Sequence, residues 1–493
     1  MSPAEPTPLA LHPFKGLIQT VCAVVLALLF TAICWLAWSL IARRRLQVHI
    51  DAIATLGQPF WQKDFPVTQL PDADNAAPLW KAVFVAYPTN DVCPANNNFT
   101  FNDYPPFSAQ WEQLEDQSIA SNANFLAMVH RAAAKPVDWG VAAHSPIPGW
   151  PYFNPSRGTA NILGDAILHA HFHGDDALAI QRTQDLIQLA RVDGSIEGLI
   201  GRLAYVGIQE LCNDRLMCIT PDLVLEGDAP AAAAPHTAAP RKEVESVIRS
   251  LLDDSNDIHA QIEAMDWERT YDHQAFEADR KAVWTLGPLI DLSEARVLMT
   301  AAVDRLAVAA PSETAATMVY QSNPKPVMGS GAPNFWNPKA APGAPRQWAG
   351  IYEDPAWSLS RYVQVEWARA AQSRCCAISL AIRLYRGDHQ GAWPAKLSQL
   401  VPAYLPAIPA DPFAPTPSPI GYIIRKNGTS DGHDRPMLYY NLTGNPATTP
   451  LPPNPNFGSI QSVDQWRDVS RWYPVVAATP SATTASSPQA GNH

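Results

Sequence analysis

Residues 16–42 restrict what this chain can fold into more than any other stretch, because no side chain there carries a charge. A helix of about 20 apolar residues, rising about 1.5 Å per residue, covers the roughly 30 Å hydrocarbon layer of a bilayer. Lys15 precedes the stretch and three arginines follow it at 43–45. Trp35 and Trp38 lie near one end, and indole side chains favour the headgroup boundary. The sequence therefore predicts a transmembrane helix over residues 16–42.

A cleaved signal peptide is the alternative interpretation of this stretch. Signal peptides have a shorter apolar core, about 7 to 15 residues, followed by a cleavage site of small residues. Here the apolar run is longer and is followed by arginines. We therefore expect a retained signal anchor, hence a single-pass membrane protein with the lipid bilayer as a partner.

Composition limits the remaining functions. The 493-residue chain leaves about 450 residues after the predicted span, enough for two or three domains. Its formal net charge of −11 would repel nucleic-acid phosphates, so we expect no nucleic-acid partner. The 47 prolines favour long loops and linkers beside the folded parts.

The apolar residues beyond the span mostly recur at helical steps. In residues 111–134 and 159–223 they return every three or four positions. Asp175 or Asp176 can cap a new helix after Gly174, and consecutive helices with short polar joints usually pack as hairpins. The predicted fold class is mainly α, with an N-terminal transmembrane helix, a helical-hairpin bulk and a small C-terminal α+β module.

The C-terminal module is predicted to be a long helix on an antiparallel hairpin. Asp354-Pro355 is a typical helix start, and residues 421–425 and 437–441 are predicted to be two strands joined through Asn427-Gly428 and a polar loop. These patterns divide the chain into an N-terminal tail (1–15), the transmembrane helix (16–42), a helical domain (43–226), an Ala/Pro linker (227–240), a helical segment (241–310), a Pro/Gly-rich loop region (311–353), the module (354–445) and a mostly irregular, disordered tail (446–493).

The sequence Asp-His-Gln-Gly-Ala-Trp-Pro at 388–394 follows the predicted helix, and Asp411-Pro412 comes after it. With these residues in this order, the module resembles the C-terminal half of pseudopilin-like proteins, in particular the major pseudopilin of type II secretion. The chain looks closer to large bacterial membrane-anchored proteins of unassigned function that carry the same ending. The resemblance implies a structural, assembly or interaction role in the cell envelope, related to secretion or pili, with envelope proteins as partners. The signature positions are Asp388, His389, Gly391, Trp393, Pro394, Asp411 and Pro412.

The chain also departs from the pseudopilin pattern. Val21 stands where a prepilin has a glutamate, and the loop 441–446 lacks the aspartates of the family's calcium site. These departures argue against calcium binding and against assembly into a pseudopilus. The arginines at 43–45 favour a cytoplasmic C-terminal side, whereas the resemblance implies the opposite side. We expect the bulk of the chain to be extracytoplasmic.

The densest metal-like pattern is His169-x-His171-x-His173 followed by Asp175-Asp176. On a helix, His169 and His173 share a face, and with Asp176 they could hold zinc. A polar joint between two helices accounts for the same residues without a metal, and we expect no cofactor. In the module, we expect Asp411 to accept backbone hydrogen bonds in a turn and His389 to be a loop residue.

Other titratable residues suggest no reaction. His259, Glu263, Asp266, His273 and Glu277 follow one face of a helix predicted to run from Arg241 to about Val283, and we expect that face to be solvated. Five cysteines lie outside the span without C-x-x-C spacing, which is typical of buried thiols. The sequence contains no G-x-S-x-G, H-E-x-x-H or phosphate-binding loop. We therefore expect a non-enzymatic protein, with a membrane-anchored metal-dependent hydrolase that uses the His/carboxylate clusters as the alternative.

Overall fold

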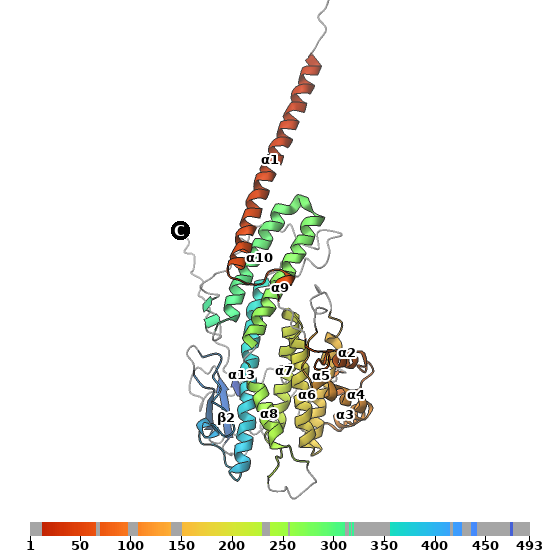
Figure 1. Cartoon of the computed structure of the whole chain (residues 1–493), viewed down its shortest axis with the longest axis vertical. Coiled ribbons are helices and arrows are strands. Elements are labelled where there is room, and N and C mark those ends of the chain that lie inside the picture. The colour runs from red at the N-terminus through yellow and green to blue at the C-terminus, as the bar shows by residue number, and fades with distance from the viewer. Residues whose placement is uncertain are drawn as a thin grey trace, which may run out of the picture. The chain divides into compact units, whose positions relative to one another are not determined.

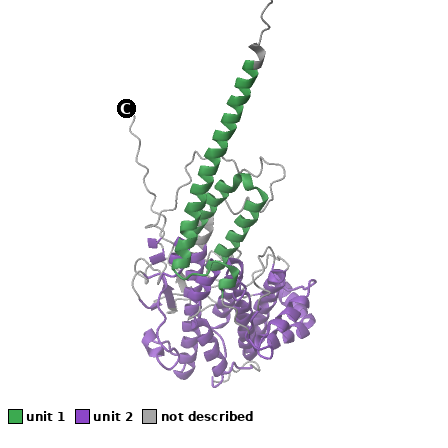
Figure 2. Cartoon of the chain, turned by 45° about the horizontal axis from the view of Figure 1, so that its top comes forward, with its two compact units in different colours: residues 1–65, 266–302 green, residues 66–265, 303–493 purple. Residues whose placement is uncertain are grey.

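The computed structural model describes residues 12–65, 70–96, 107–139, 150–228, 237–254, 257–310, 315–316, 318–319, 355–414, 418–425, 435–440 and 474–476. The described part is mainly helical, as predicted (Figure 1). It forms two compact units, coloured separately in Figure 2. Unit 1 comprises Met1–Phe65 and Asp266–Ala302, and unit 2 comprises Pro66–Met265 and Val303–His493.

Unit 1 is built on one long helix, α1 (His12–Thr55). A short turn η1 (Gln62–Asp64) follows it, and most of α9 (Asp257–Ala282) and α10 (Gly287–Val308), joined by η4 (Trp284–Leu286), completes the unit. The N-terminal part of α1 is long and apolar enough to cross a membrane, and its side chains are exposed. Farther along, one face of α1 is buried, where Leu46 and Ile53 pack with Ala295 and Leu298 of α10. The helix thus changes from a stretch that is apolar on all sides to a stretch that buries one face.

The carboxylate–histidine stripe predicted to be solvated is partly buried, which corrects that expectation. His273 Nδ1 lies in a short hydrogen bond with the Glu294 carboxylate of α10, and both side chains are buried. Asp266 is buried beside Arg269, 2.9 Å away. The single predicted helix is also broken, because α8 (Arg241–Leu252) ends before α9 begins at Asp257. The partners that turn this face inward come from other segments, so the periodicity of one helix could not reveal them.

Unit 2 is a body of packed helices. Helix α5 (Phe153–Phe172) ends just before Gly174, which adopts a φ of 82°. The Asp175 carboxylate then accepts from the Leu178 backbone N–H (3.1 Å), which caps α6 (Asp176–Gly194) as predicted. All five cysteines outside α1 are buried, also as predicted. Its helices, besides α8, are α2 (Ala77–Val85), η2 (Pro94–Asn96), α3 (Ala109–Ser121), α4 (Ala123–Ala133), α5 (Phe153–Phe172), α6 (Asp176–Gly194), α7 (Leu199–Ile219), α13 (Pro355–Asp388) and η5 (Leu397–Leu400).

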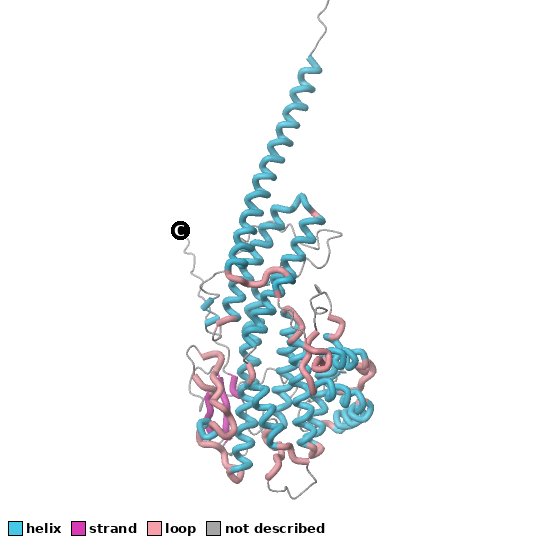
Figure 3. The backbone as a smooth tube through the Cα atoms, viewed as in Figure 1, coloured by secondary structure: helices cyan, strands magenta, loops and turns pink. Residues whose placement is uncertain are grey.

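The C-terminal segment contains the predicted helix and hairpin. Strands β1 (Gly421–Arg425) and β2 (Arg435–Tyr440) pair antiparallel, whereas β3 (Pro474–Val476) pairs parallel with β2 and was not predicted. Figure 3 shows how small this sheet is beside the helices. The apolar residues of α13, among them Cys375, Ile378 and Ile382, pack in the same hydrophobic cluster as residues of α5, α6 and α7. The loop 441–446, the turn at 427–428 and the tail beyond 479 lie outside the described residues.

A buried ion-pair network lies where α13 packs against α7. The Glu366 carboxylate, only 2% exposed, accepts from Arg202 (2.8 Å) and Arg369 (3.1 Å). Arg369 also contacts Asp257 at 2.5 Å, and the Tyr362 hydroxyl donates to Glu366 at 3.0 Å. Two guanidinium groups and two carboxylates therefore balance in the interior of unit 2. Because buried charges are tolerated only when paired, this network specifies one register of α13 on α7.

Removing Glu366 tests how much unit 2 depends on this network. We expect Glu366→Ala to lower the free energy of unfolding by about 3–5 kcal/mol, because two buried guanidinium groups lose a partner. The control, Asp253→Ala, removes the exposed pair with Arg191 (3.8 Å) and should cost less than about 1 kcal/mol. Denaturant unfolding followed by circular dichroism measures both, and equal losses would contradict the prediction.

Candidate functional site

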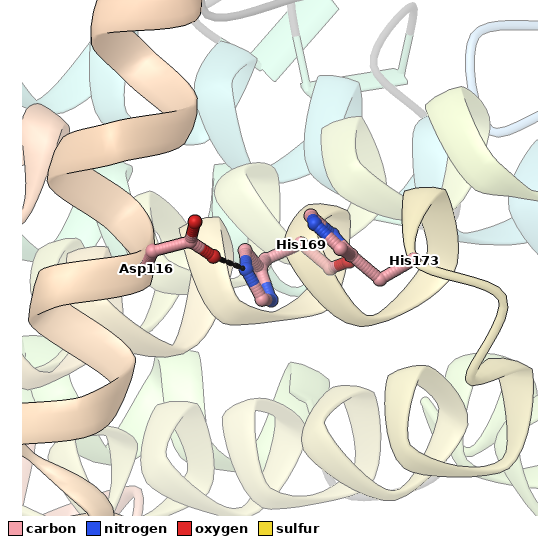
Figure 4. Close-up of side chains that lie close together, drawn as sticks. All are labelled: Asp116, His169 and His173. Atoms are coloured by element: carbon pink, nitrogen blue, oxygen red, sulfur yellow. Dashed lines mark hydrogen bonds and ion pairs between the residues drawn. The ribbon is translucent and has the colours of Figure 1, made fainter.

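Two of the predicted metal candidates, His169 and His173, lie together near the end of α5 (Figure 4). Their imidazole rings stack with centroids 4.0 Å apart, as expected for positions one turn apart. Asp116 of α3 approaches from a second helix, and its carboxylate lies 2.8 Å from His169 Nε2. The Asp116 side chain is 63% exposed, so this cluster is open to solvent.

The three side chains offer one ligand atom each, within 4.8 Å of one another. His173 Nδ1 lies 2.9 Å from the backbone carbonyl oxygen of His169, so Nδ1 donates and Nε2 keeps its lone pair. Two imidazoles and a carboxylate with an open position are the donor set of many catalytic zinc sites. Without a metal, the same hydrogen bond between His169 and Asp116 simply ties α3 to α5.

Asp176, the third predicted candidate, lies elsewhere. Its carboxylate is buried, 2.5 Å from His171 Nδ1, and accepts from the Val224 backbone N–H at 2.7 Å. Asp175 occupies the capping position of α6, which turns the next side chain toward the interior. Asp116 was missed because it lies 53 residues before His169 on another helix, and no sequence spacing connects the two.

A second titratable cluster is buried between α3, α5 and α7. The Asp165 carboxylate accepts from the Cys93 thiol (3.2 Å) and the Ala95 backbone N–H (3.0 Å), and it pairs with Arg215 at 3.3 Å. In the described part of the chain, neither carboxylate oxygen of Glu115 has a hydrogen-bond partner. Burial first, and then the negative charge of Asp165, raise the pKa of Glu115 to about 10.

The same burial raises the pKa of the Cys93 thiol far above its usual range. A thiol that stays protonated is a poor nucleophile and a poor metal ligand. Glu115 is likewise neutral near pH 7, because burial disfavours its carboxylate. The cluster can therefore hold helices together, but as it stands it supplies no activated nucleophile or base.

The signature residues at the end of α13 make local structural contacts. The Asp388 carboxylate accepts from Arg241 and from the Tyr404 hydroxyl, both at 2.7 Å. His389 stacks on Tyr385, with ring centroids 3.8 Å apart, and its Nδ1 donates to the Tyr385 carbonyl at 2.8 Å. These groups join the end of α13 to α8 and to the chain that follows.

The remaining signature residues shape the turn and the loop after α13. Gly391 has a φ of 80°, and the Trp393 ring lies 3.9 Å from the Arg386 guanidinium. The Pro394 carbonyl accepts from the Tyr422 hydroxyl at 2.8 Å, which connects this segment to β1. Asp411, followed by the buried Pro412, accepts from the Phe413 backbone N–H (2.9 Å), the turn role expected of it.

The pH dependence of stability tests the burial of Glu115. A folded-state pKa of about 10, against an ordinary value of 4.5, means that folding takes up a proton, so stability falls as the pH rises between these values. Glu115→Gln removes this dependence. We expect its stability relative to the parent protein to increase by more than about 1 kcal/mol from pH 5 to pH 8.

The matched control is Glu112→Gln, the same change at an exposed position of α3. Thermal unfolding of the three proteins at pH 5, 6.5 and 8 measures the difference. The control keeps Glu115, so we expect its stability relative to the parent protein to change much less with pH than that of Glu115→Gln. Parallel stability curves for the parent protein and Glu115→Gln would show that Glu115 is ionised in the folded protein.

Comparisons with known proteins assign no role to either cluster. No protein-family model matches the chain, and neither a curated protein nor a solved structure matches it significantly. The case for a function therefore rests on the chain's own residues: the apolar helix α1, the exposed Asp116–His169–His173 cluster and the packing around α13.

Proposed function

We propose that this chain is a single-pass, membrane-anchored envelope protein with a structural, assembly or interaction role. One observation carries the proposal: α1 is a single helix that has an exposed, uncharged apolar part and a part buried in unit 1. Phe30, in the apolar part, is 69% exposed. Side chains of this kind along a whole helical stretch are favoured in lipid and unfavourable in water.

The contacts of α1 with the rest of unit 1 support a retained anchor over a cleaved signal. Trp35 Nε1 donates to the Thr285 carbonyl oxygen at 3.0 Å, and its ring packs edge-on against Trp284 with centroids 6.0 Å apart. Ala42 and Leu46 are buried farther along the same face. Cleavage at the end of the apolar stretch would remove Trp35 from these contacts, which supports a retained helix.

The interaction role rests on the helical bulk and on the pseudopilin resemblance. The helix of the resembling module is packed into the core of unit 2, which favours a fixed envelope component over a subunit that stacks through a free helix. A role related to secretion or pili follows only from the resemblance. The placement of the bulk on the extracytoplasmic side also follows only from the resemblance. The arginines at 43–45 favour the cytoplasmic side.

Alkaline extraction of membranes tests the anchor. We expect the full-length protein to remain in the pellet after high-salt and carbonate washing. Val25→Lys with Leu29→Lys places two charges in the exposed apolar part of α1 and should release most of the protein. The control, Val48→Lys with Leu56→Lys, adds the same charges at exposed positions beyond the arginines and should leave the protein in the pellet. Release of the unaltered protein would overturn the proposal.

A metal-dependent hydrolase is the second candidate function, and the Asp116–His169–His173 cluster is the observation that favours it. The cluster is exposed, and its three side chains would hold a zinc ion, which would supply an activated water molecule. Asp116 and His173 come from different helices, so binding would also cross-link α3 to α5 and raise stability by mass action.

Zinc titration of the purified full-length protein decides this second candidate. Under it, we expect one equivalent of Zn²⁺ to raise the unfolding temperature, and His173→Ala to remove most of that shift. The control, His259→Ala, changes an exposed histidine of α9 and should keep the full shift. If Zn²⁺ stabilises neither the parent protein nor the control, the hydrolase loses the structural observation that favours it.

A further inference from the structure

The closed end of the α9–α10 hairpin is an apolar surface. No charged residue lies between Lys281 and Asp291, a stretch that reads Ala-Val-Trp-Thr-Leu-Gly-Pro-Leu-Ile. Three of its large side chains are exposed: Val283 by 42%, Trp284 by 69% and Leu289 by 39%. We call residues 282–290 the hairpin tip. Exposed apolar side chains that gather on one surface are typical of a site that contacts a membrane or another molecule.

The hairpin tip lies beside the apolar part of α1, within the same compact unit (Figure 2). Trp35 joins them through its hydrogen bond to the Thr285 carbonyl and its edge-on contact with Trp284. The predicted span reaches Ala42, and the first charge after it is on Arg43. Trp35 lies about 12 Å before Arg43 along the helix, so the tip reaches into the layer that the span occupies.

The pattern of burial on α1 also places the hairpin tip at the level of Trp35. Trp35, Ser39, Ala42 and Leu46 are less exposed than their neighbours and recur at three- and four-residue steps, so they form one covered face. All residues from Lys15 to Cys34 are exposed. The covered face therefore begins within the uncharged stretch, at the level of the hairpin tip, and continues beyond the arginines.

The charges flanking the tip suit a membrane boundary. Arg280 pairs with Asp291 (2.8 Å) and Glu294 (2.5 Å), so its charge is neutralised within the hairpin. Lys281, which follows Arg280 directly before the tip, is exposed, so that its ammonium group can reach lipid phosphates. Trp284 and Trp35 place two indoles at one level, and tryptophan is enriched at the headgroup boundary.

We propose that the hairpin tip is a second membrane-binding element, which inserts into the headgroup–hydrocarbon boundary beside α1. The inference rests on the proposed anchor, because the depth of the tip is set by its contact with Trp35. The partner is the lipid bilayer itself. With two points of attachment, unit 1 cannot rotate freely about the axis of α1 or slide along the bilayer normal, so the bilayer fixes its orientation.

Site-specific labelling of the full-length protein in lipid nanodiscs tests this inference. Ala282→Cys and Ala302→Cys place a thiol at exposed alanines of the same unit, at the tip and far from it along α10. Both are made with Cys22→Ser and Cys34→Ser, the exposed native cysteines. A third protein carries Cys34→Ser alone, so that Cys22, in the span, is its exposed cysteine and marks the position of the anchor. Each carries an environment-sensitive fluorophore.

Quenching by lipids with spin labels on the acyl chains is compared with quenching by aqueous iodide. We expect the label at 282 to be quenched at least twofold more by lipid than the label at 302, and to be protected from iodide. Reaction of the unlabelled thiols with a charged, membrane-impermeant reagent provides a second readout without an apolar probe. It should be at least tenfold slower at 282 than at 302.

The outcomes separate the inference from the proposed function. If Cys22 is quenched by lipid but position 282 behaves like position 302 in both assays, the tip lies in water and the inference is wrong, while the anchor stands. If the label at Cys22 is itself accessible to iodide and not quenched by lipid, the anchor fails and the inference fails with it. Lipid quenching at both Cys22 and 282 supports both.

Discussion

The contact between α1 and the α9–α10 hairpin is the interaction on which the proposed arrangement depends. Leu46 and Ile53 of α1 pack with Ala295 and Leu298, so one helix is both part of a folded unit and long enough to enter a bilayer. A continuous helix has no flexible joint. Whatever depth the apolar stretch adopts therefore fixes the depth of the hairpin beside it. This coupling explains why a second lipid contact at the tip needs no further docking surface.

Paired charges lie in the interior of both units, where they join neighbouring helices. Glu366 joins α13 to α7 in unit 2, and Glu294 joins α10 to α9 in unit 1 through His273 and Arg280. Such pairs gain little stability over apolar packing, but any misregistered helix would leave a charge unpaired. Most of the described buried titratable groups fit this pattern. The Asp116–His169–His173 cluster differs because it is exposed and offers one ligand atom from each of its three side chains.

The C-terminal module, which the sequence predicts from residue 354 to 445, is structurally continuous with the helical bulk. Its helix α13 shares a hydrophobic cluster with α5, α6 and α7, and Asp388 reaches Arg241 at the start of α8. At the end of this helix, Asp388 pairs with Arg241 and Tyr404, and His389 stacks on Tyr385. The Pro394 carbonyl accepts a hydrogen bond from Tyr422. These contacts account for a stable turn between α13 and the small sheet, and this role requires no calcium ion and no second copy of the chain.

The sequence by itself determined the apolar stretch of α1, the helical class of the fold, the Asp175 cap and the hairpin of β1 and β2, because each depends on neighbours a few residues apart. It also predicted that His169 and His173 share a face. Only the tertiary structure decided that Asp116 is their third partner, that Asp176 and His273 are buried, and that Trp284 meets Trp35. Those contacts join segments up to 250 residues apart. Their formation depends on how whole helices pack, and no local periodicity encodes that.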